Sequence, residues 1–469
     1  MRAETGQADD GPAVGQHAIV IGAGIAGLVA ARVLTDQFAY VTLIERDALP
    51  PQAAPRPGVP QARHVHVLLL RGQRLLAQLF PGLPAELTAA GAPVLNWTRD
   101  WAIFQNGGWV PRCASDYVGF LCSRDLLEAC LRARLRQRGT VTFLEQQAVT
   151  GLVLDARGRA ITGVRVRARG GAGRPAGAEA MLGAQFVVDA SGRDSQAPQW
   201  LAALGYPAPA ETTINAHQAY ASRWYRPPPG RQPEVVLVGG TPPHEPYGGG
   251  VYPMEGGRWL VSLGGVNGVV PPLDEAGFLA FARGLPQPAV YAALQAAEPL
   301  TPIVGYQRTA NRLRHYERLA RQPEGFVVLG DAVCTFNPVY GQGMTVAALG
   351  AALLGRSLRA PHRAGPAGAL TGVAQRFQRR LARLNATPWL LATGADLRWP
   401  GTTGGRPSRG ARLVQAYIDQ VLRVVLVDDG AYRVLLEVTH LLRPPRVLFG
   451  PQVVAAVVRD AVRRRGARP

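Results

Sequence analysis

The stretch His17–Asp47, HAIVIGAGIAGLVAARVLTDQFAYVTLIERD, decides the fold of this chain. An apolar strand over residues 18–21 is followed by three glycines, Gly22, Gly24 and Gly27. A helical pattern and a second apolar strand, which ends at Glu45, come next. This is the GxGxxG pattern in its strand-turn-helix context, with an acidic residue about 20 positions further on. The stretch therefore predicts a Rossmann-type domain that binds a dinucleotide.

Each residue type in this pattern has a physical role. The first glycine permits a tight turn, the second lets a pyrophosphate approach the backbone, and the third lets helix and strand pack closely. The helix N-terminus presents free N–H groups and the positive end of the helix dipole to the phosphates. Glu45 can accept hydrogen bonds from a ribose. We expect a bound dinucleotide here rather than a glycine-rich turn without a ligand.

The composition excludes some classes of protein. The length of 469 residues suggests two or three domains, and 47% hydrophobic residues exclude global disorder. The net charge is +19, but the chain contains no lysine, so all 51 basic residues are arginine. This composition is typical of a GC-rich genome as much as of a basic surface, and no nucleic-acid motif is present. We expect no nucleic-acid partner, although a basic surface suits an acidic substrate or an acidic carrier protein.

Metal, disulfide and membrane signals are absent from the sequence. The chain has four cysteines: Cys113, Cys122, Cys130 and Cys334. They form no CxxC pair and have no neighbouring histidine cluster, so we expect neither a zinc site nor a disulfide framework. His64 and His66 alternate in an extended segment without a third ligand, and we expect packing or cofactor-contact histidines there. Residues 1–16 lack an apolar signal core, and no run reaches the roughly 18 apolar residues of a spanning helix. We expect a cytoplasmic protein without a transmembrane segment.

Three later segments add to the fingerprint. A predicted helix capped by Ser123 carries Arg124 in its first turn, where a cation opposes the helix dipole and needs an anionic partner such as a pyrophosphate. The strand AQFVVDASGRDS, residues 184–195, ends in Asp189 and Gly192. The apolar run 326–329 leads into GDAVCTFNPVYGQGM, residues 330–344, where an aspartate stands before a proline and two glycines that open a helix.

The rest of the chain is predicted to form two further units. Residues 197–312 alternate strand patterns with proline-rich turns, which predicts a largely antiparallel sheet inserted in the nucleotide-binding domain. After Met344 the patterns are mainly helical, and the chain ends in the basic RRRGARP. We expect these last helices to form a cover, with a membrane-surface or partner role as the alternative.

The chain carries three motifs in order: the fingerprint, the middle motif VVDASGRDS and the late motif GDAVCTFNPVYGQGM. This ordered set resembles the motifs of the flavin-dependent monooxygenases with the para-hydroxybenzoate hydroxylase fold. The resemblance implies non-covalently bound FAD. It implies an α/β fold, α+β overall, with a Rossmann-type FAD-binding domain, an inserted mainly antiparallel β-sheet substrate domain and a C-terminal helical extension. The expected division is 1–95, 116–196 and 316–385 for the FAD-binding domain, 96–115 and 197–315 for the substrate domain, and 386–469 for the helical domain.

The resemblance also implies roles for single residues. Asp331 would accept hydrogen bonds from the ribityl chain of FAD, and Arg124 would reach its phosphates. Pro338 would pass its backbone beside the isoalloxazine ring, and the helix opening at Gly341–Gly343 would direct N–H groups at the ring, where they stabilise the negative charge of reduced flavin. No side chain is expected to be catalytic beyond this positioning. The expected cofactor-binding residues are Gly22, Gly24, Ile25, Ala26, Gly27, Glu45, Arg46, Arg63, Arg124, Val149, Asp189, Gly192, Asp331, Pro338, Gly341, Gln342, Gly343 and Met344.

The middle motif narrows the resemblance to one branch of the family. Aromatic hydroxylases usually carry Asp directly before the glycine, whereas here Ser191 precedes Gly192 and the acid is Asp189. This DASGR form resembles the branch with geranylgeranyl reductases, halogenases and polyether epoxidases. Flavin halogenases rely on a lysine, which this chain cannot supply. The tracts VPQARHVHVLLLRG, NPVYGQGMT and ATGADLRWPGTTGG look most like the bacterial polyether epoxidases, which are relatives of squalene epoxidase.

This resemblance implies a monooxygenase that uses O2 to epoxidise carbon–carbon double bonds of a polyene, such as a polyketide in polyether (antibiotic) biosynthesis, through a flavin C4a-hydroperoxide. Tyr225, Tyr252 and Trp259 of the inserted sheet are expected to bind the hydrophobic polyene, which an acidic carrier protein could present. Because no second GxGxxG is present, NAD(P)H is expected to bind transiently, or a separate flavin reductase to supply electrons. The alternatives are a hydroxylase of another hydrophobic substrate, a geranylgeranyl-type double-bond reductase, and a flavin-binding protein without turnover.

Overall fold

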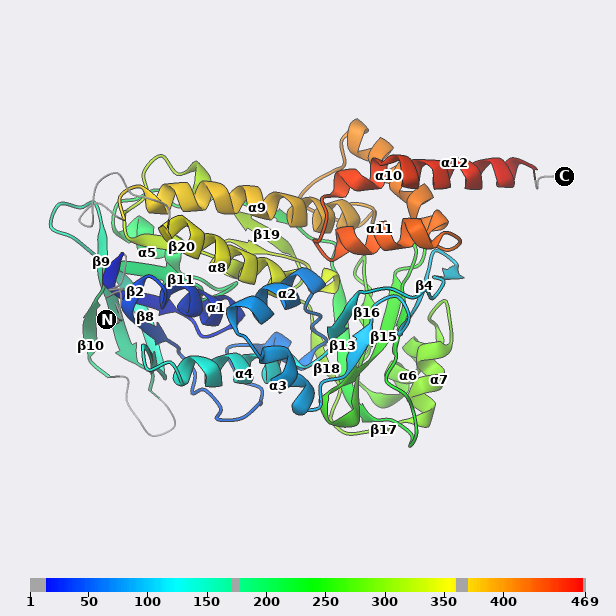
Figure 1. The fold of residues 1–469 in the computed structure, drawn as a ribbon, viewed down its shortest axis with the longest axis horizontal. Coiled ribbons are helices and arrows are strands. Elements are labelled where there is room, and N and C mark those ends of the chain that lie inside the picture. The colour runs from blue at the N-terminus through cyan, green and yellow to red at the C-terminus, as the bar shows by residue number, and fades with distance from the viewer. Residues whose placement is uncertain (1–13, 171–176, 360–369, 467–469) are drawn as a thin grey trace, which may run out of the picture.

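Five parallel strands form the sheet that carries the fingerprint (Figure 1). The computed structural model describes residues 14–170, 177–359 and 370–466. The sheet has the order β20 (Phe326–Val328), β11 (Phe186–Asp189), β1 (Gly15–Ile21), β2 (Phe38–Ile44) and β7 (Val141–Leu144). All four neighbouring pairs are parallel. Its strands are short runs of Val, Ile, Leu and Phe because both faces are buried, as in other all-parallel sheets.

Helices and a small sheet bury this parallel sheet. The helices are α1 (Ile25–Leu34), α4 (Arg124–Arg136), α8 (Gly343–Arg359) and α9 (Val373–Asp396). Helix α1 contacts α4 and α8, and α8 contacts α9. The small sheet is an antiparallel meander of β8 (Gln147–Leu154), β9 (Ile161–Ala168) and β10 (Glu179–Gly183), and β9 contacts β11. The Ser123 side chain caps α4 as predicted, because its hydroxyl accepts a hydrogen bond from the Leu126 N–H.

A second, eight-stranded sheet lies beside the first (Figure 1). Its strands are β4 (Trp101–Gln105), β5 (Gly108–Trp109), β13 (Ala219–Arg226), β14 (Val235–Val238), β15 (Tyr247–Met254), β16 (Arg258–Gly265), β17 (Glu298–Pro299) and β18 (Val304–Tyr306). All its pairs are antiparallel except β14 with β4, which is parallel. The prediction of a largely antiparallel sheet is therefore confirmed. Helices α6 (Glu275–Arg283) and α7 (Ala289–Ala296) cover one face of it.

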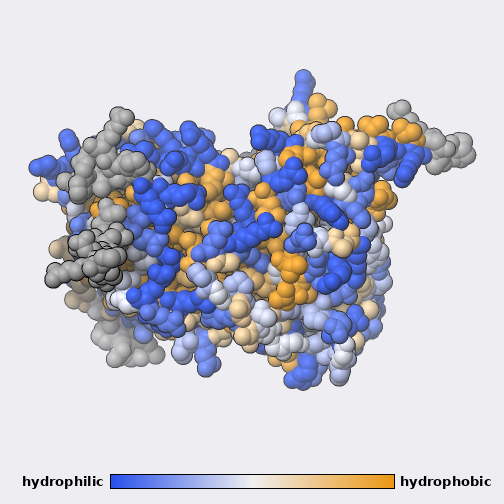
Figure 2. Space-filling view, in the orientation of Figure 1, coloured by the Kyte–Doolittle hydropathy of each residue, from blue (hydrophilic) through white to orange (hydrophobic). Residues whose placement is uncertain are grey.

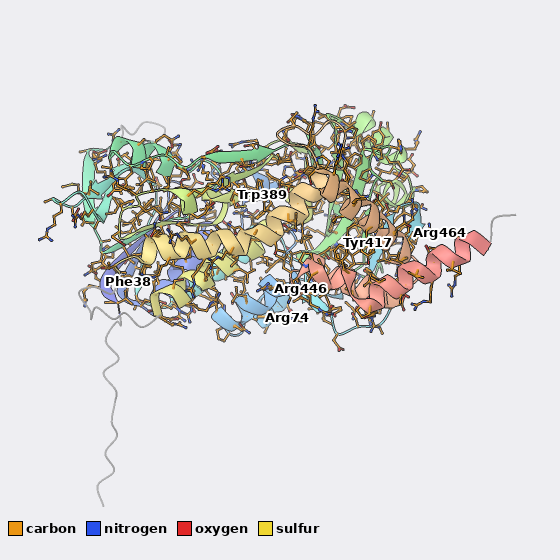
Figure 3. All side chains as sticks on the ribbon, turned by 90° about the horizontal axis from the view of Figure 1, so that it is seen from above. Phe38, Arg74, Trp389, Tyr417, Arg446 and Arg464 are labelled. Carbon is orange, nitrogen blue, oxygen red and sulfur yellow. The ribbon has the colours of Figure 1, made fainter. Side chains whose placement is uncertain are left out.

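Smaller elements connect the two sheets. They are β3 (Val94–Asn96) with β6 (Val118–Phe120), the sheet β12 (Glu211–Ile214)–β19 (Asn311–Arg314)–β21 (Cys334–Thr335), and helices α2 (Leu70–Leu79), α3 (Leu83–Ala89) and α5 (Ala197–Ala203). Seen from above, α9 runs from the nucleotide-binding part, where Phe38 is labelled, past Trp389 to the C-terminal helices (Figure 3). Helix α9 is continuous across positions 385 and 386, where a domain boundary was expected.

Three C-terminal helices pack against the β4 edge of the large sheet. They are α10 (Arg409–Val424), α11 (Asp429–Thr439) and α12 (Pro451–Gly466). Val424 of α10 and Tyr432 of α11 belong to one hydrophobic cluster with Trp101 of β4 and with Trp97, which follows β3. Figure 2 shows hydrophobic residues on the surface of these helices, and Leu413 is the most exposed large hydrophobic side chain there. Among the described residues, no helix is both long enough and apolar enough to cross a bilayer.

Candidate functional site

A cavity of about 440 Å³ opens where β1, β2 and β11 end. Ligands of open parallel sheets bind at this carboxyl edge of the strands. The structure brings most of the predicted cofactor residues to its wall. Those that line it are Gly22, Gly24, Ile25, Ala26, Glu45, Arg46, Arg124, Val149, Gly192, Asp331, Pro338, Gly341, Gly343 and Met344. The remaining four, Gly27, Arg63, Asp189 and Gln342, do not line it.

The fingerprint glycines shape one end of the cavity. Gly22 has φ of +97°, in the region that favours glycine, and a Cβ atom there would lie 2.8 Å from the Ala190 carbonyl oxygen. Gly27 packs directly on Gly22 and not on the cavity, which explains why it is absent from the wall. A Cβ atom on Gly24 would lie 3.4 Å from Nη2 of Arg124. Helix α1 begins beside this point without a side-chain cap, so its first N–H groups remain open to an anion.

Arg56 joins Arg124 at this end, and the sequence analysis missed it. Its Nη2 atom would lie 3.9 Å from a Cβ atom on Gly24, and the side chain is buried. It forms ion pairs with Glu45 (3.0 Å), Asp47 (3.2 Å) and Glu128 (3.4 Å). The arginine stands in the loop sequence PRPG, which resembles an ordinary surface turn. Only the fold reveals that three acidic residues from separate segments converge on it.

Glu45 is held in place by the protein. Its Oε2 atom accepts a hydrogen bond from the Ala23 N–H (2.8 Å) and pairs with Arg56, and its Oε1 atom accepts from the Asp47 N–H (3.1 Å). A carboxylate offers about four acceptor positions. Three of them are occupied, which leaves room for one donor from a ligand. The geometry therefore suits a single ribose hydroxyl.

Asp331 follows β20 and lines the cavity beside the start of α8. The carboxylate is half-buried, and within the described ranges it receives no hydrogen bond or ion pair. Burial raises its pKa, while the guanidinium of Arg124 and those of Arg193 and Arg312 oppose this shift. A Cβ atom on Gly343 would lie 3.9 Å from its Oδ1 atom, so the carboxylate stands beside the first residue of α8. An unpaired acceptor next to a helix N-terminus suits a ligand with hydroxyl donors.

The turn between Asp331 and α8 is fixed by a buried polar network. Asp396 at the end of α9 accepts hydrogen bonds from Asn311 Nδ2 (2.6 Å), Asn337 Nδ2 (3.1 Å) and the Tyr340 hydroxyl. The Asn337 N–H donates to Asn311 Oδ1 (2.7 Å). Burial raises the pKa of Asp396, and its three donors oppose that shift. The network holds the backbone around Pro338, which lines the cavity. Nothing in the local sequence pointed to Asp396.

Three of the other predicted cofactor residues lie away from the cavity for identifiable reasons. Asp189 is fully buried at the end of β11, where its carboxylate accepts hydrogen bonds from the Ser195 hydroxyl and the Ser191 N–H (2.9 Å). It therefore shapes the turn that carries Gly192 and does not line the cavity. Arg63 is exposed in the short 3₁₀ helix Pro60–Arg63. Gln342 is buried, and its Oε1 atom has no hydrogen-bond partner among the described residues.

The three predicted substrate residues are not on the cavity. Tyr225 and Trp259 are buried in the hydrophobic cluster under α6 and α7, because side chains alternate along a strand and theirs point to the helix-covered face. Tyr252 points to the opposite face, where its ring centroid lies 6.2 Å from that of Trp101. The sequence pattern could not distinguish the two faces.

The opposite face of the large sheet brings other aromatic residues near the cavity. Tyr306 lines the cavity, and its ring stacks on Tyr220 with centroids 6.1 Å apart. His64 lies beside both rings, 5.5 Å from Tyr306 and 5.8 Å from Tyr220. His66, two residues on, lines the cavity itself. The His-x-His pattern signalled these contacts, whereas the two tyrosines were missed.

The arrangement suits an elongated, anionic dinucleotide. One end offers two guanidiniums and open helix N–H groups over a glycine, the middle offers carboxylate acceptors, and the far end offers the N-terminus of α8. Among the described residues, no group of three or more His, Cys, Asp or Glu side chains could hold a metal ion. Among the described residues that line the cavity, no serine or cysteine forms a hydrogen bond with a histidine that could act as its base. The cavity therefore fits a bound organic cofactor better than nucleophilic catalysis.

Comparisons with known proteins agree with the fold. No family model matches the chain. Protein Rv3254 of Mycobacterium tuberculosis (strain ATCC 25618 / H37Rv) is 36% identical over 417 residues, which are 88% of this chain and 86% of that protein. Among solved structures, the flavin-dependent brominase Bmp2 has a TM-score of 0.63 at 14% identity, covering 96% of this chain and 99% of its own. PqsL, a probable FAD-dependent monooxygenase from Pseudomonas aeruginosa, has a TM-score of 0.58 at 18% identity, covering 82% and 97%. The chain thus has the α/β fold of FAD-dependent monooxygenases and halogenases.

Proposed function

The chain belongs to the same family as protein Rv3254 of Mycobacterium tuberculosis, and from this premise and its fold we propose that it is an FAD-dependent monooxygenase that epoxidises carbon–carbon double bonds of an apolar polyene. The observation that carries the cofactor assignment is one cavity that holds two guanidiniums over Gly24 and, near Arg124, the unpaired carboxylate of Asp331. FAD has a pyrophosphate that suits the guanidiniums and a ribityl chain whose hydroxyl groups suit the carboxylate.

The residues present would hold FAD at four places. Arg56, Arg124 and the first N–H groups of α1 would bind the pyrophosphate. Glu45 would accept one ribose hydroxyl, and Asp331 would accept ribityl hydroxyls. The N-terminus of α8 would stabilise negative charge on the ring system. When bound and reduced, FAD supplies the electrons and the activation of O2.

The protein's own part in the reaction is positioning and the exclusion of water. An alkene is already electron-rich, so no general base has to deprotonate it before oxygen transfer. We propose that the aromatic face around Tyr220, Tyr252 and Tyr306 holds the polyene against the cavity and keeps water out. The aromatic and apolar character of this face suits a hydrophobic substrate.

Reducing equivalents would come from outside the chain. The sequence holds no second GxGxxG pattern for a permanently bound nicotinamide. We propose that NAD(P)H binds transiently, or that a flavin reductase supplies the electrons. Three arginines line the cavity, Arg46, Arg193 and Arg308, of which Arg308 pairs with Asp194, and their positive charge would attract such an anionic reductant.

The experiment that tests the proposal offers the purified holoprotein a series of linear trienes with NADPH or a flavin reductase under labelled O2. We expect one labelled oxygen atom in an epoxide product. Gain of hydrogen without oxygen would instead assign a double-bond reductase. Incorporation of halogen when bromide or chloride is added would assign a halogenase, which the absence of lysine argues against. A product with a labelled hydroxyl group on an intact alkene would assign a hydroxylase.

A further inference from the structure

We propose that His66 binds the cofactor directly, by accepting a hydrogen bond at Nε2 from a hydroxyl group of its polyhydroxylated segment. This inference rests on the proposed function, because it assigns a new contact to the same cavity. Neither the GxGxxG fingerprint nor the late aspartate motif contains this residue. Its support is the geometry of the segment that connects the 3₁₀ helix Pro60–Arg63 to α2.

The hydrogen bonds of the two neighbouring histidines determine which nitrogen of His66 is free. The Nδ1 atom of His66 lies 3.0 Å from the carbonyl oxygen of His64. A carbonyl oxygen only accepts, so Nδ1 carries the proton and donates. Nε2 is then an acceptor with a free lone pair. Within the described ranges no residue donates a hydrogen bond to it, and the side chain lines the cavity.

His64 keeps this segment in place. Its Nδ1 atom lies 2.8 Å from the Ser222 hydroxyl oxygen, and that hydroxyl donates to Ser262 Oγ at 2.9 Å. His64 is therefore the donor to Ser222, and it ties the segment to β13 and β16 of the large sheet. In the His-x-His pattern, the first histidine attaches the backbone to the sheet, and its carbonyl orients the second histidine.

The electrostatics of the site keep His66 neutral. Burial, followed by the positive charge of Arg124, lowers the pKa of His66 to about 3. The same guanidinium opposes the raised pKa of Asp331, so Arg124 acts on both acceptors. Near Arg124, the cavity wall therefore carries one neutral acceptor and one carboxylate. A ligand segment rich in hydroxyl donors satisfies both, whereas a phosphate, which is an acceptor, satisfies neither.

The test measures FAD affinity by titration of apoprotein. His66→Leu removes the acceptor, and we expect the Kd for FAD to rise about three- to tenfold, the usual effect of one neutral hydrogen bond. His66→Gln keeps an acceptor at the position of Nε2, and we expect its Kd to stay within about twofold of the wild type. His244→Leu, at an exposed histidine outside the cavity lining, is the matched control and should bind FAD like the wild type.

A second readout on the wild-type protein does not depend on any variant's folding. In protein labelled with ¹⁵N-histidine, the His66 Nε2 resonance of the apoprotein should be that of an unprotonated nitrogen, and it should shift when FAD is added. Wild-type affinity in His66→Leu, or an Nε2 resonance that FAD leaves unchanged, would overturn the inference. If the wild-type protein binds no FAD at all, the proposed function itself fails, which separates the two results.

Discussion

A Cβ atom on Gly27 would lie 1.8 Å from the carbonyl oxygen of Gly22. Backbone therefore meets backbone where β1 enters α1, and no side chain fits between them. The two glycines couple the turn to the helix, so the N–H groups at the start of α1 keep their position at the edge of the cavity. The close approach is a property of the fold that the spacing of the motif predicts.

Gly27→Ala should destabilise the protein and abolish FAD binding. The added methyl group forces β1 and α1 apart, and overpacking of this severity costs about 3 kcal/mol or more. Chemical denaturation measures the free energy of unfolding, and flavin content of the purified protein measures binding. Gly394→Ala in α9 is the matched control, because nothing lies within 4 Å of its added Cβ. It should stabilise by about 0.5–1 kcal/mol, the usual gain in a helix. Equal effects of the two changes would contradict this account.

Asp331→Ala should weaken FAD binding by about 1.5–3 kcal/mol, the usual range for hydrogen bonds to a charged group. Its stability should change little in the apoprotein, because the carboxylate has no hydrogen-bond partner among the described residues. Isothermal titration of apoprotein with FAD gives the affinity. Asp460→Ala on α12, far from the cavity lining, serves as the control. Unchanged affinity in Asp331→Ala would remove this residue from the cofactor site.

Glu45 behaves differently in this structure from Asp331. Its carboxylate pairs with buried Arg56 and accepts from two backbone N–H groups, so Glu45→Ala leaves these two N–H groups without their acceptor, while Arg56 keeps Asp47 and Glu128. A buried donor left unsatisfied costs about 1–3 kcal/mol. Because the two backbone N–H groups lose their acceptor, we expect Glu45→Ala to lower both the free energy of unfolding and FAD affinity. A variant that loses affinity alone would show that the ion pair is unimportant for the fold.

Asp396 should be energetically coupled to Tyr340. Asp396→Ala removes the acceptor of the Tyr340 hydroxyl and one of the acceptors of the Asn311 and Asn337 amides, which keep Ile214 O and Gln218 Oε1, at a cost of about 3 kcal/mol. Tyr340→Phe should then cost less in the Asp396→Ala background than in the wild type, because its hydrogen bond is already gone. Denaturant unfolding of the four proteins in the cycle measures the coupling. Strictly additive effects would mean that the hydrogen bond contributes nothing.

The local parts of the site could be predicted from the sequence, and the non-local parts could not. Gly22, Gly24 and Asp331 were predicted for the site and line the cavity, because their positions depend on the chain within a few residues. Arg56 depends on three acidic residues distributed over 84 positions from 45 to 128, and Asp396 depends on residues from other strands and turns. No local pattern encodes such convergence.

The inserted sheet shows the same limit. Alternation along a strand places successive side chains on opposite faces of the sheet. It carried no information on which face α6 and α7 would cover, so Tyr225 and Trp259 were expected at the ligand and lie in the core. The position of Tyr306 on the cavity follows from the pairing of β18 with β13, which links strands about 80 residues apart.

The pH dependence of stability should reveal the buried His440. Burial lowers its pKa from 6.5 to about 3, and its Nδ1 accepts a hydrogen bond from the Leu70 N–H (3.1 Å). Above pH 6.5 it is neutral in both the folded and the unfolded chain. As the pH falls below 6.5, only the unfolded chain binds the proton, so the wild type loses up to about 1.4 kcal/mol per pH unit through this group.

His440→Asn keeps an acceptor for Leu70 and removes the titration. The free energy of unfolding of the variant minus that of the wild type should therefore increase as the pH is lowered from about 7 to about 5. All other titrating groups cancel in this difference. Urea unfolding of both proteins across that range provides the measurement. If the difference in the free energy of unfolding does not change with pH, His440 is protonated in the folded protein as easily as in the unfolded chain.

The central claim is that this cavity holds FAD without a covalent bond, and the flavin content of the purified protein tests it most directly. The absorption spectrum should show flavin, and denaturation should release it completely. Mass spectrometry of the supernatant should identify FAD, in a ratio that approaches one molecule per chain at saturation. The released cofactor should rebind to refolded wild type and fail to rebind to Gly27→Ala. Protein that stays colourless after incubation with FAD, or flavin that remains attached to the denatured chain, would contradict the account.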